Sequence, residues 1–194
     1  MIGKNTNFLE IEHKFVLDQS KPRDQILELL GALPSQKKTQ INVVDQYFLT
    51  PLLPKRVFRH RLDEEIQQLT LKSLEDSPEV RKEINLNLGL DFGDQGNAIQ
   101  AFIEQLVPEF ESFKINKQVW VFYQKDAEIV YYEARAAELS VRCLEIEALN
   151  APTIETGLAT ISRYEKVLGF EADQASNKTL LELLAPPNLV EQFS

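Results

Sequence analysis

Hydrophobic and polar residues alternate along much of this chain, and a period of two is typical of half-buried β-strands. Successive side chains of a strand point to opposite faces, so each such segment would have one apolar and one polar face. Eight segments follow this pattern closely enough to predict strands. They span residues 8–17, 41–49, 56–62, 66–74, 80–88, 113–124, 128–136 and 139–148.

Four other segments carry apolar residues at helical spacing. They span residues 21–33, 98–106, 152–168 and 179–184. Pro34 helps to end the first of them, and Gly169 suits the C-cap of the third. The order of strands, helix, strands and then helices is typical of an α+β fold with an antiparallel sheet. Eight strands are enough to close such a sheet into a barrel with a central cavity.

The size and composition of the chain limit the classes of function. Its 194 residues fit one domain, and no linker, repeat or low-complexity segment divides them, so we expect a single domain over residues 1–194. The hydrophobic fraction of 43% and the charged fraction of 26% are ordinary for a soluble globular protein. A net charge of −9 argues against broad binding of nucleic acid or an anionic membrane. A site for a polyanion must therefore be a local basic pocket.

The cysteine content and the N-terminal residues give information about the cellular compartment. The single cysteine, Cys143, excludes an internal disulfide framework and a cysteine-rich metal site, and it suits a reducing cytosol. The N-terminal segment lacks the apolar stretch of a signal peptide, and no window reaches the run of about 20 apolar residues that spans a bilayer. We expect a cytoplasmic protein without a membrane partner.

Several of the predicted strands have one strongly charged face. Glu10, Glu12 and Lys14 share a face of the first strand, and two carboxylates followed by an ammonium can hold a divalent cation and the anion that it carries. The same spacing pairs residues on four later strands: Arg59 with Arg61, Thr70 with Lys72, Arg81 with Glu83, and Glu145 with Glu147. Such faces meet solvent on a half-exposed sheet, or point inward in a barrel. Like charges this close repel unless a counter-ion separates them, which slightly favours the barrel, but spacing alone leaves both interpretations open.

Seven segments in a fixed order carry a more specific signal. They are Glu10–Lys14 (E-x-E-x-K), Asp45–Pro51 (D-x-Y-F-D-T-P, with Leu49 in place of the last acidic residue), Arg59–Arg61 (R-x-R), Leu69–Lys72 (L-T-x-K), Arg81–Glu83 (R-x-E), Leu144–Glu147 (a late E-I-E strand) and Asn177–Leu184 (S-Y-x-x-L-L, without the tyrosine). Together they resemble the CYTH superfamily, also called triphosphate tunnel metalloenzymes. The resemblance covers nearly the whole chain.

This resemblance implies a closed eight-stranded antiparallel barrel that forms a tunnel, with helices packed outside it. It implies Mg²⁺ or Mn²⁺ as the cofactor, because hard carboxylate oxygens suit these ions. It implies catalytic roles for Glu10, Glu12 and Lys14, and a supporting role for Glu83. The implied metal ligands are Glu10, Glu12, Glu145 and Glu147, and the implied phosphate ligands are Lys14, Arg59, Arg61, Lys72, Arg81 and Lys117.

The chain departs from the family pattern at two positions of these later strands. The family usually has K-x-R after the middle helix, whereas this chain has Lys117-Gln118-Val119, so one phosphate arginine is missing. The family usually has an aspartate near the metal on the next strand, and here Glu133 is the nearest equivalent. Arg135, two residues later, could supply the missing guanidinium.

Four further residues are expected to pack rather than react. His13 and His60 are in phase with apolar neighbours, so both should point away from the tunnel. Cys143 is in phase with the late glutamates, but a packed cysteine is more common than a nucleophile. Trp120 is out of phase with Lys117 and is expected in the core.

Three functions remain open, and each has a triphosphate-containing small molecule as its partner. The first is metal-dependent hydrolysis of inorganic triphosphate, a nucleoside triphosphate or thiamine triphosphate. The second is a class IV adenylyl cyclase, which converts ATP to cyclic AMP and pyrophosphate, although the histidine- and glycine-containing segment typical of that group is absent around Glu10. The third is binding of triphosphate or polyphosphate without catalysis, which the departures at Leu49 and Val119 favour. A homodimer is plausible for the family.

Overall fold

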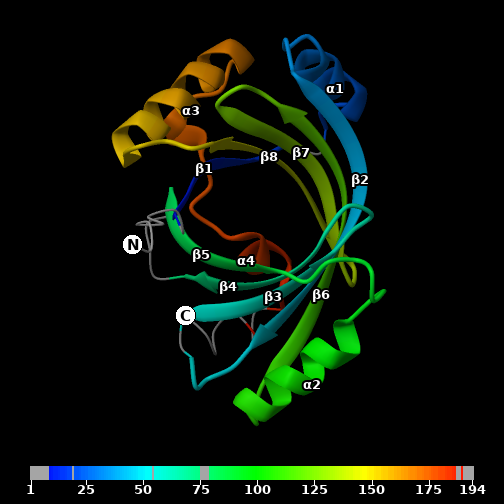
Figure 1. Ribbon diagram of the computed structural model, residues 1–194. Coiled ribbons are helices and arrows are strands. Elements are labelled where there is room, and N and C mark those ends of the chain that lie inside the picture. Colours follow the sequence, from blue (N-terminus) through cyan, green and yellow to red (C-terminus); the bar gives the residue numbers. More distant parts are fainter. Residues whose placement is uncertain (1–8, 19, 54, 75–78, 187–188, 190–194) are drawn as a thin grey trace.

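The chain forms a closed β-barrel with helices on its outside (Figure 1). The computed structural model describes residues 9–18, 20–53, 55–74, 79–186 and 189. The strands are β1 (Leu9–Val16), β2 (Lys37–Leu49), β3 (Arg56–Leu62), β4 (Gln67–Ser73), β5 (Val80–Asn87), β6 (Glu111–Tyr123), β7 (Ala127–Ala136) and β8 (Leu139–Ala148). The helices are α1 (Arg23–Gly31), α2 (Gly96–Leu106), α3 (Ile154–Leu168), the 3₁₀ turn η1 (Ala172–Gln174) and α4 (Leu180–Leu184).

The barrel has the strand order β1-β5-β4-β3-β2-β6-β7-β8, and all of its neighbours are antiparallel. Strand β1 closes it by pairing with β5 on one side and with β8 on the other. The predicted fold class is therefore confirmed. The largest boundary difference is in β2, which begins at Lys37 rather than at Ile41, because its first residues pair with the end of β6, where Lys37 lies opposite Tyr123.

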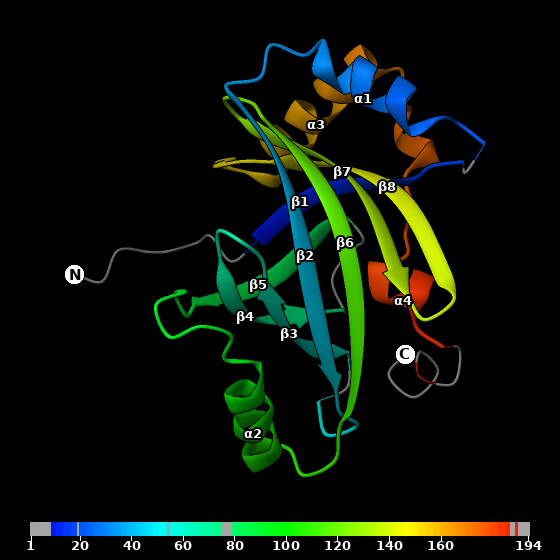
Figure 2. The same ribbon diagram turned by 90° about the vertical axis from the view of Figure 1, so that its right-hand side faces the viewer.

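Helices cover the outside of the barrel on two sides. Figure 2 shows α1 and α3 together on one side and α2 on the other. The core under α1 and α3 joins Ile26 and Leu30 to the outward apolar face of β7 and β8. Helix α3 approaches β1 closely at Gly157, where an added Cβ would come within 2.7 Å of Ile11. Glycine at this position therefore sets the distance between the helix and the barrel.

One end of the barrel interior is filled by α4. Leu180, Leu181 and Leu184 of this helix lie in one apolar cluster with Leu49 and Val57 of the barrel. The Thr179 side chain caps the helix by accepting a hydrogen bond from the Glu182 backbone N–H. The short C-terminal helix predicted from the sequence is thus confirmed, and it closes the end of the barrel at which β2 finishes.

The four residues expected to pack all contact other side chains of the fold. His13 points outward and its Nδ1 lies 2.6 Å from a carboxylate oxygen of Glu165 in α3. The His60 ring contacts the Gln67 amide, and Trp120 packs against a tyrosine ring outside the tunnel. Cys143 is fully buried in the core cluster beside α4.

Among the helices of the described residues, none has the length and hydrophobicity that a membrane-spanning segment requires.

Candidate functional site

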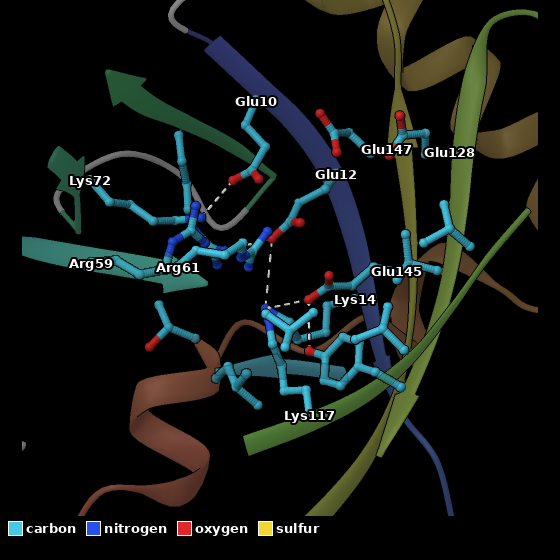
Figure 3. A pocket seen from close by; sticks show the side chains of 18 of the residues that line it. Glu10, Glu12, Lys14, Arg59, Arg61, Lys72, Lys117, Glu128, Glu145 and Glu147 are labelled. Atoms are coloured by element: carbon cyan, nitrogen blue, oxygen red, sulfur yellow. Dashed lines mark hydrogen bonds and ion pairs between the residues drawn. The ribbon is translucent and has the colours of Figure 1, made fainter. Parts of the chain in front are cut away.

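The barrel encloses a cavity of about 230 Å³, lined by charged side chains of both signs (Figure 3). The alternation of each strand turns these side chains inward, while the apolar residues between them face the helices. The basic residues that line it are Lys14, Arg59, Arg61, Lys72, Arg81 and Lys117, and the acidic ones are Glu10, Glu12, Asp63, Glu128, Glu145 and Glu147.

Asp45 holds two of the basic side chains in place. Its carboxylate is fully buried and accepts hydrogen bonds from Arg61 Nε at 2.8 Å and Nη2 at 3.0 Å. Its second oxygen also lies 2.5 Å from Lys117 Nζ. Burial alone would raise the pKa of Asp45, but the charges of Arg61 and Lys117 overcome it and hold this pKa well below its usual range. Asp45 is therefore ionised and fixes both cations.

Glu83 acts in the same way on the neighbouring strands. Its carboxylate pairs with Lys72 and lies 3.4 Å from Arg59 Nη2, which also donates to the Thr70 hydroxyl at 3.3 Å. Burial opposes ionisation, but the charges of Arg59 and Lys72 lower the pKa of Glu83 to about 2. Glu83 therefore lies against two of the basic side chains, Arg59 and Lys72.

Strand β1 supplies carboxylates that face basic residues across the cavity (Figure 3). Lys72 Nζ donates to Glu10 at 2.6 Å, and Arg81 Nη1 donates to Glu12 at 2.7 Å. Lys14, on the same face of β1, lies 3.1 Å from Glu145. Each of these three basic side chains thus has a carboxylate partner in the cavity.

Glu147 and Glu128 lie in a different environment. Glu147 lies directly opposite Glu12 in the β1–β8 register and opposite Glu128 in the β7–β8 register. No basic side chain of the described residues pairs with Glu147 or Glu128, whereas Lys14 pairs with Glu145. Burial and the neighbouring carboxylates, Glu10 first among them, hold the pKa of Glu147 well above its usual range.

Glu10 shows the same crowding to a lesser degree. Burial and the charge of Glu12 raise the pKa of Glu10 to about 7, although Lys72 opposes this shift. Carboxylates in such a group are ligands of the kind that Mg²⁺ and Mn²⁺ prefer. They are not already arranged around one point, since no group of three or more acidic, histidine or cysteine side chains within the described residues could hold a metal ion as it stands.

Two predicted site residues lie elsewhere. Glu133 and Arg135 are on the outer face of β7, where Glu133 accepts a hydrogen bond from the Tyr131 hydroxyl at 2.9 Å and Arg135 is exposed. The physical reason is the phase of the strand: Tyr132 points inward, so residues one and three positions later point outward. Their predicted place in the tunnel is therefore wrong.

Sequence reasoning also missed three acidic residues, one of which, Asp63, lines the cavity directly after β3. On β7 the carboxylate that lines the cavity is Glu128, which is in phase with Val130 and Tyr132. Asp45 lies in the D-x-Y-F segment that carried the resemblance, but no role was assigned to it. The remaining predicted residues, apart from Glu83 behind Lys72, all line the one cavity.

Comparison with known proteins agrees with this geometry. The sequence model of the CYTH domain matches residues 9–174. No sequence of a curated protein matches the chain significantly. The structure is similar to that of PH1012 protein from Pyrococcus horikoshii OT3, with a TM-score of 0.74 and 21% sequence identity, over 90% of this chain and 99% of that one.

Two further solved structures are similar at lower identity. One is described as a putative adenylate cyclase from Bacillus halodurans, with a TM-score of 0.61 and 13% identity over 91% of this chain and 97% of that one. The other is a putative adenylyl cyclase from Hippeastrum, described as having a dominant triphosphatase activity, with a TM-score of 0.61 and 17% identity over 89% of this chain and 93% of that one. At these identities the likeness concerns the fold.

Proposed function

Because the chain belongs to the CYTH domain family, we propose that it hydrolyses a triphosphate compound inside the barrel with the help of a divalent metal ion. The observation that carries this proposal is the convergence of six basic side chains on one cavity that also holds a group of crowded carboxylates. A triphosphate needs the basic side chains to neutralise its oxygens, and its metal ion needs the carboxylates as ligands.

The basic side chains suit a chain of three phosphoryl groups. Arg59, Arg61 and Arg81 can each bind phosphate oxygens through two N–H groups, whereas the lysines act as point charges. Three of these cations now pair with carboxylates of β1: Lys72 pairs with Glu10, and Arg81 and Lys14 pair with Glu12. A metal–triphosphate complex would offer each sign a better partner, so binding would separate these pairs.

The metal ion would be held by Glu10, Glu12 and Glu147, with Glu128 and Glu145 beside them. When bound, it would polarise the phosphoryl group and lower the pKa of the attacking water. Water attacks the terminal phosphorus as the bond from that phosphorus to its bridging oxygen breaks. The products are orthophosphate and the diphosphate that remains. Lys14 and Lys117 would stabilise the charge that develops on the phosphoryl oxygens.

A phosphorus NMR time course with Mg²⁺, tripolyphosphate and ATP in one tube tests this function. We expect orthophosphate to appear, and the signal that shrinks identifies the substrate. Glu12→Gln should abolish the release, whereas Glu133→Gln, on the outer face of β7, should leave it unchanged.

The same experiment separates the alternatives. Pyrophosphate and cyclic AMP without orthophosphate would show the chemistry named for the Bacillus halodurans neighbour and overturn the hydrolase. Broadened tripolyphosphate lines without turnover, with Mg²⁺ or with Mn²⁺, would show a binding protein instead.

A further inference from the structure

Part of the cavity wall formed by β2, β6 and β7 is apolar, between Lys117 of β6 and Glu128 of β7. Four of its side chains, Ile41, Val119, Val121 and Val130, form what we call the apolar shelf. Val119 and Val121 are each 6% exposed, whereas Ile41 and Val130 are only half-buried. The two half-buried side chains keep apolar surface uncovered inside the cavity.

The strand register makes the shelf continuous. Ile41 lies opposite Val119 across β2 and β6, and Val121 lies opposite Val130 across β6 and β7. Since Val119 and Val121 share one face of β6, the two pairs are neighbours on a single surface. The shelf is thus one patch spread over three strands, not four isolated residues.

The position of the shelf relates it to the basic side chains. Lys117 precedes Val119 by two residues on the same face of β6, about 7 Å at the usual rise of a strand. Strand β2 ends at Leu49 beside α4, so Ile41 lies toward the end of the barrel that α4 does not fill. A ligand with its phosphates among the basic residues would therefore reach the shelf with a group attached to them.

An inorganic triphosphate has nothing to place on this surface. It is charged along its whole length, and an apolar wall gives it neither a counter-charge nor a hydrogen-bond donor. An aromatic ring, in contrast, gains free energy by covering apolar surface that water would otherwise contact. We therefore infer that the substrate is an organic triphosphate ester whose ring is seated on the apolar shelf. This inference rests on the proposed function and names the class of its substrate.

The test compares three compounds that share the triphosphate: tripolyphosphate, methyl triphosphate and phenyl triphosphate. Affinity is measured by calorimetry with Mg²⁺, and turnover by phosphorus NMR. Covering one face of a phenyl ring corresponds to roughly a tenfold gain in affinity over the methyl ester. Val121→Thr keeps the shape of the side chain but adds a hydroxyl, so it should reduce that gain to about twofold and leave tripolyphosphate binding unchanged.

Matched variants guard against a structural effect. Val130→Thr, at a half-buried position of the shelf, should act like Val121→Thr if the latter does not fold. Val44→Thr, on the outer face of β2 and 37% exposed, should change no affinity. Equal affinities for the phenyl and methyl esters, or an equal loss for all three compounds in the shelf variants, would overturn the inference.

The outcomes also separate this inference from the proposed function. Equal affinity together with turnover of all three compounds would remove the shelf as a ring site and leave the hydrolase in place. A tenfold preference for the phenyl ester without any turnover would support the ring site and remove the hydrolase.

Discussion

Carboxylate side chains behave differently in two regions of this barrel. Asp45 and Glu83 lie in the first region, and Glu128 and Glu147 lie in the second. The first two carboxylates are almost completely buried among arginine and lysine side chains, and these charges hold their pKa values below the usual range. The second two lie opposite each other across β7 and β8, and their pKa values are raised, by burial for Glu128 and by burial and neighbouring carboxylates for Glu147.

These two environments indicate different roles for the two pairs of carboxylates. Asp45 and Glu83 supply the counter-charge that allows several cations to stand together, so they belong to the structure of the site as much as to its chemistry. Glu128 and Glu147 have no such partner within the described residues. A cation that arrives from solvent is what would relieve their repulsion.

The largest effect is expected from breaking the first pair. Asp45→Asn keeps the shape of the side chain but leaves Arg61 and Lys117 without their counter-charge. Removing one partner of a buried ion pair costs about 3–5 kcal/mol, so the free energy of unfolding in urea should fall by that amount. Asp126→Asn breaks the exposed pair with Arg163 and should cost at most about 1 kcal/mol. Similar losses in the two variants would contradict the structural role of Asp45.

Substitution in the second pair, Glu128 and Glu147, should change the free energy of unfolding in the opposite direction. Glu147→Gln removes a crowded charge, so in metal-free buffer near pH 8 the free energy of unfolding should rise by about 1 kcal/mol. Orthophosphate release with Mg²⁺ should nevertheless fall by about 100-fold, because a proposed metal ligand is lost. A variant that loses stability as well as activity would show that Glu147 is a structural carboxylate like Asp45.

The two pairs also mark how much of the site a sequence can reveal. Charged residues two positions apart, such as Arg59 and Arg61, were found because the period of a strand is local. Asp45 has only Val43 and Tyr47 at that spacing, and its importance comes from Arg61 and Lys117 on neighbouring strands. The spacing of residues along one strand does not show which residues of a distant strand lie opposite them.

Strand β7 shows the same limit. Tyr131 and Tyr132 are adjacent and both buried, one under the helices and the other in the tunnel wall. Hydrophobicity therefore does not reveal which face of β7 is inward, and the prediction of Glu133 fell on the outer face. The eight strands and their barrel were predictable, since the alternation recurs in every strand and the family motifs fix their order.

The pH dependence of tripolyphosphate binding tests the basic residues of the cavity, and a smaller effect is expected. Burial and the neighbouring Arg61 lower the pKa of Lys117 to about 8, although Asp45 opposes the shift. Free protein loses this charge as the pH rises through about 8, whereas bound triphosphate favours the charged form. Metal-free tripolyphosphate affinity should therefore fall by up to about tenfold per pH unit above 8. Calorimetry at pH 7, 8 and 9 measures this fall in affinity, and the affinity of Lys117→Met should depend less on pH. An identical pH dependence in the variant and the unsubstituted protein would assign the change to another group.

The smallest effect is expected at Arg135, the guanidinium that the sequence suggested as a replacement for the one missing at Val119. It is exposed on the outer face of β7. At 0.15 M salt the charges of exposed groups are largely screened beyond about 8 Å, so Arg135→Ala should change tripolyphosphate affinity by less than about twofold. Arg61→Ala, which removes a guanidinium from the cavity itself, should weaken binding by about tenfold or more. If Arg135→Ala weakened binding as much as Arg61→Ala at this salt, β7 would have to turn its other face inward when ligand binds, and Glu133 rather than Glu128 would then be its metal-side carboxylate.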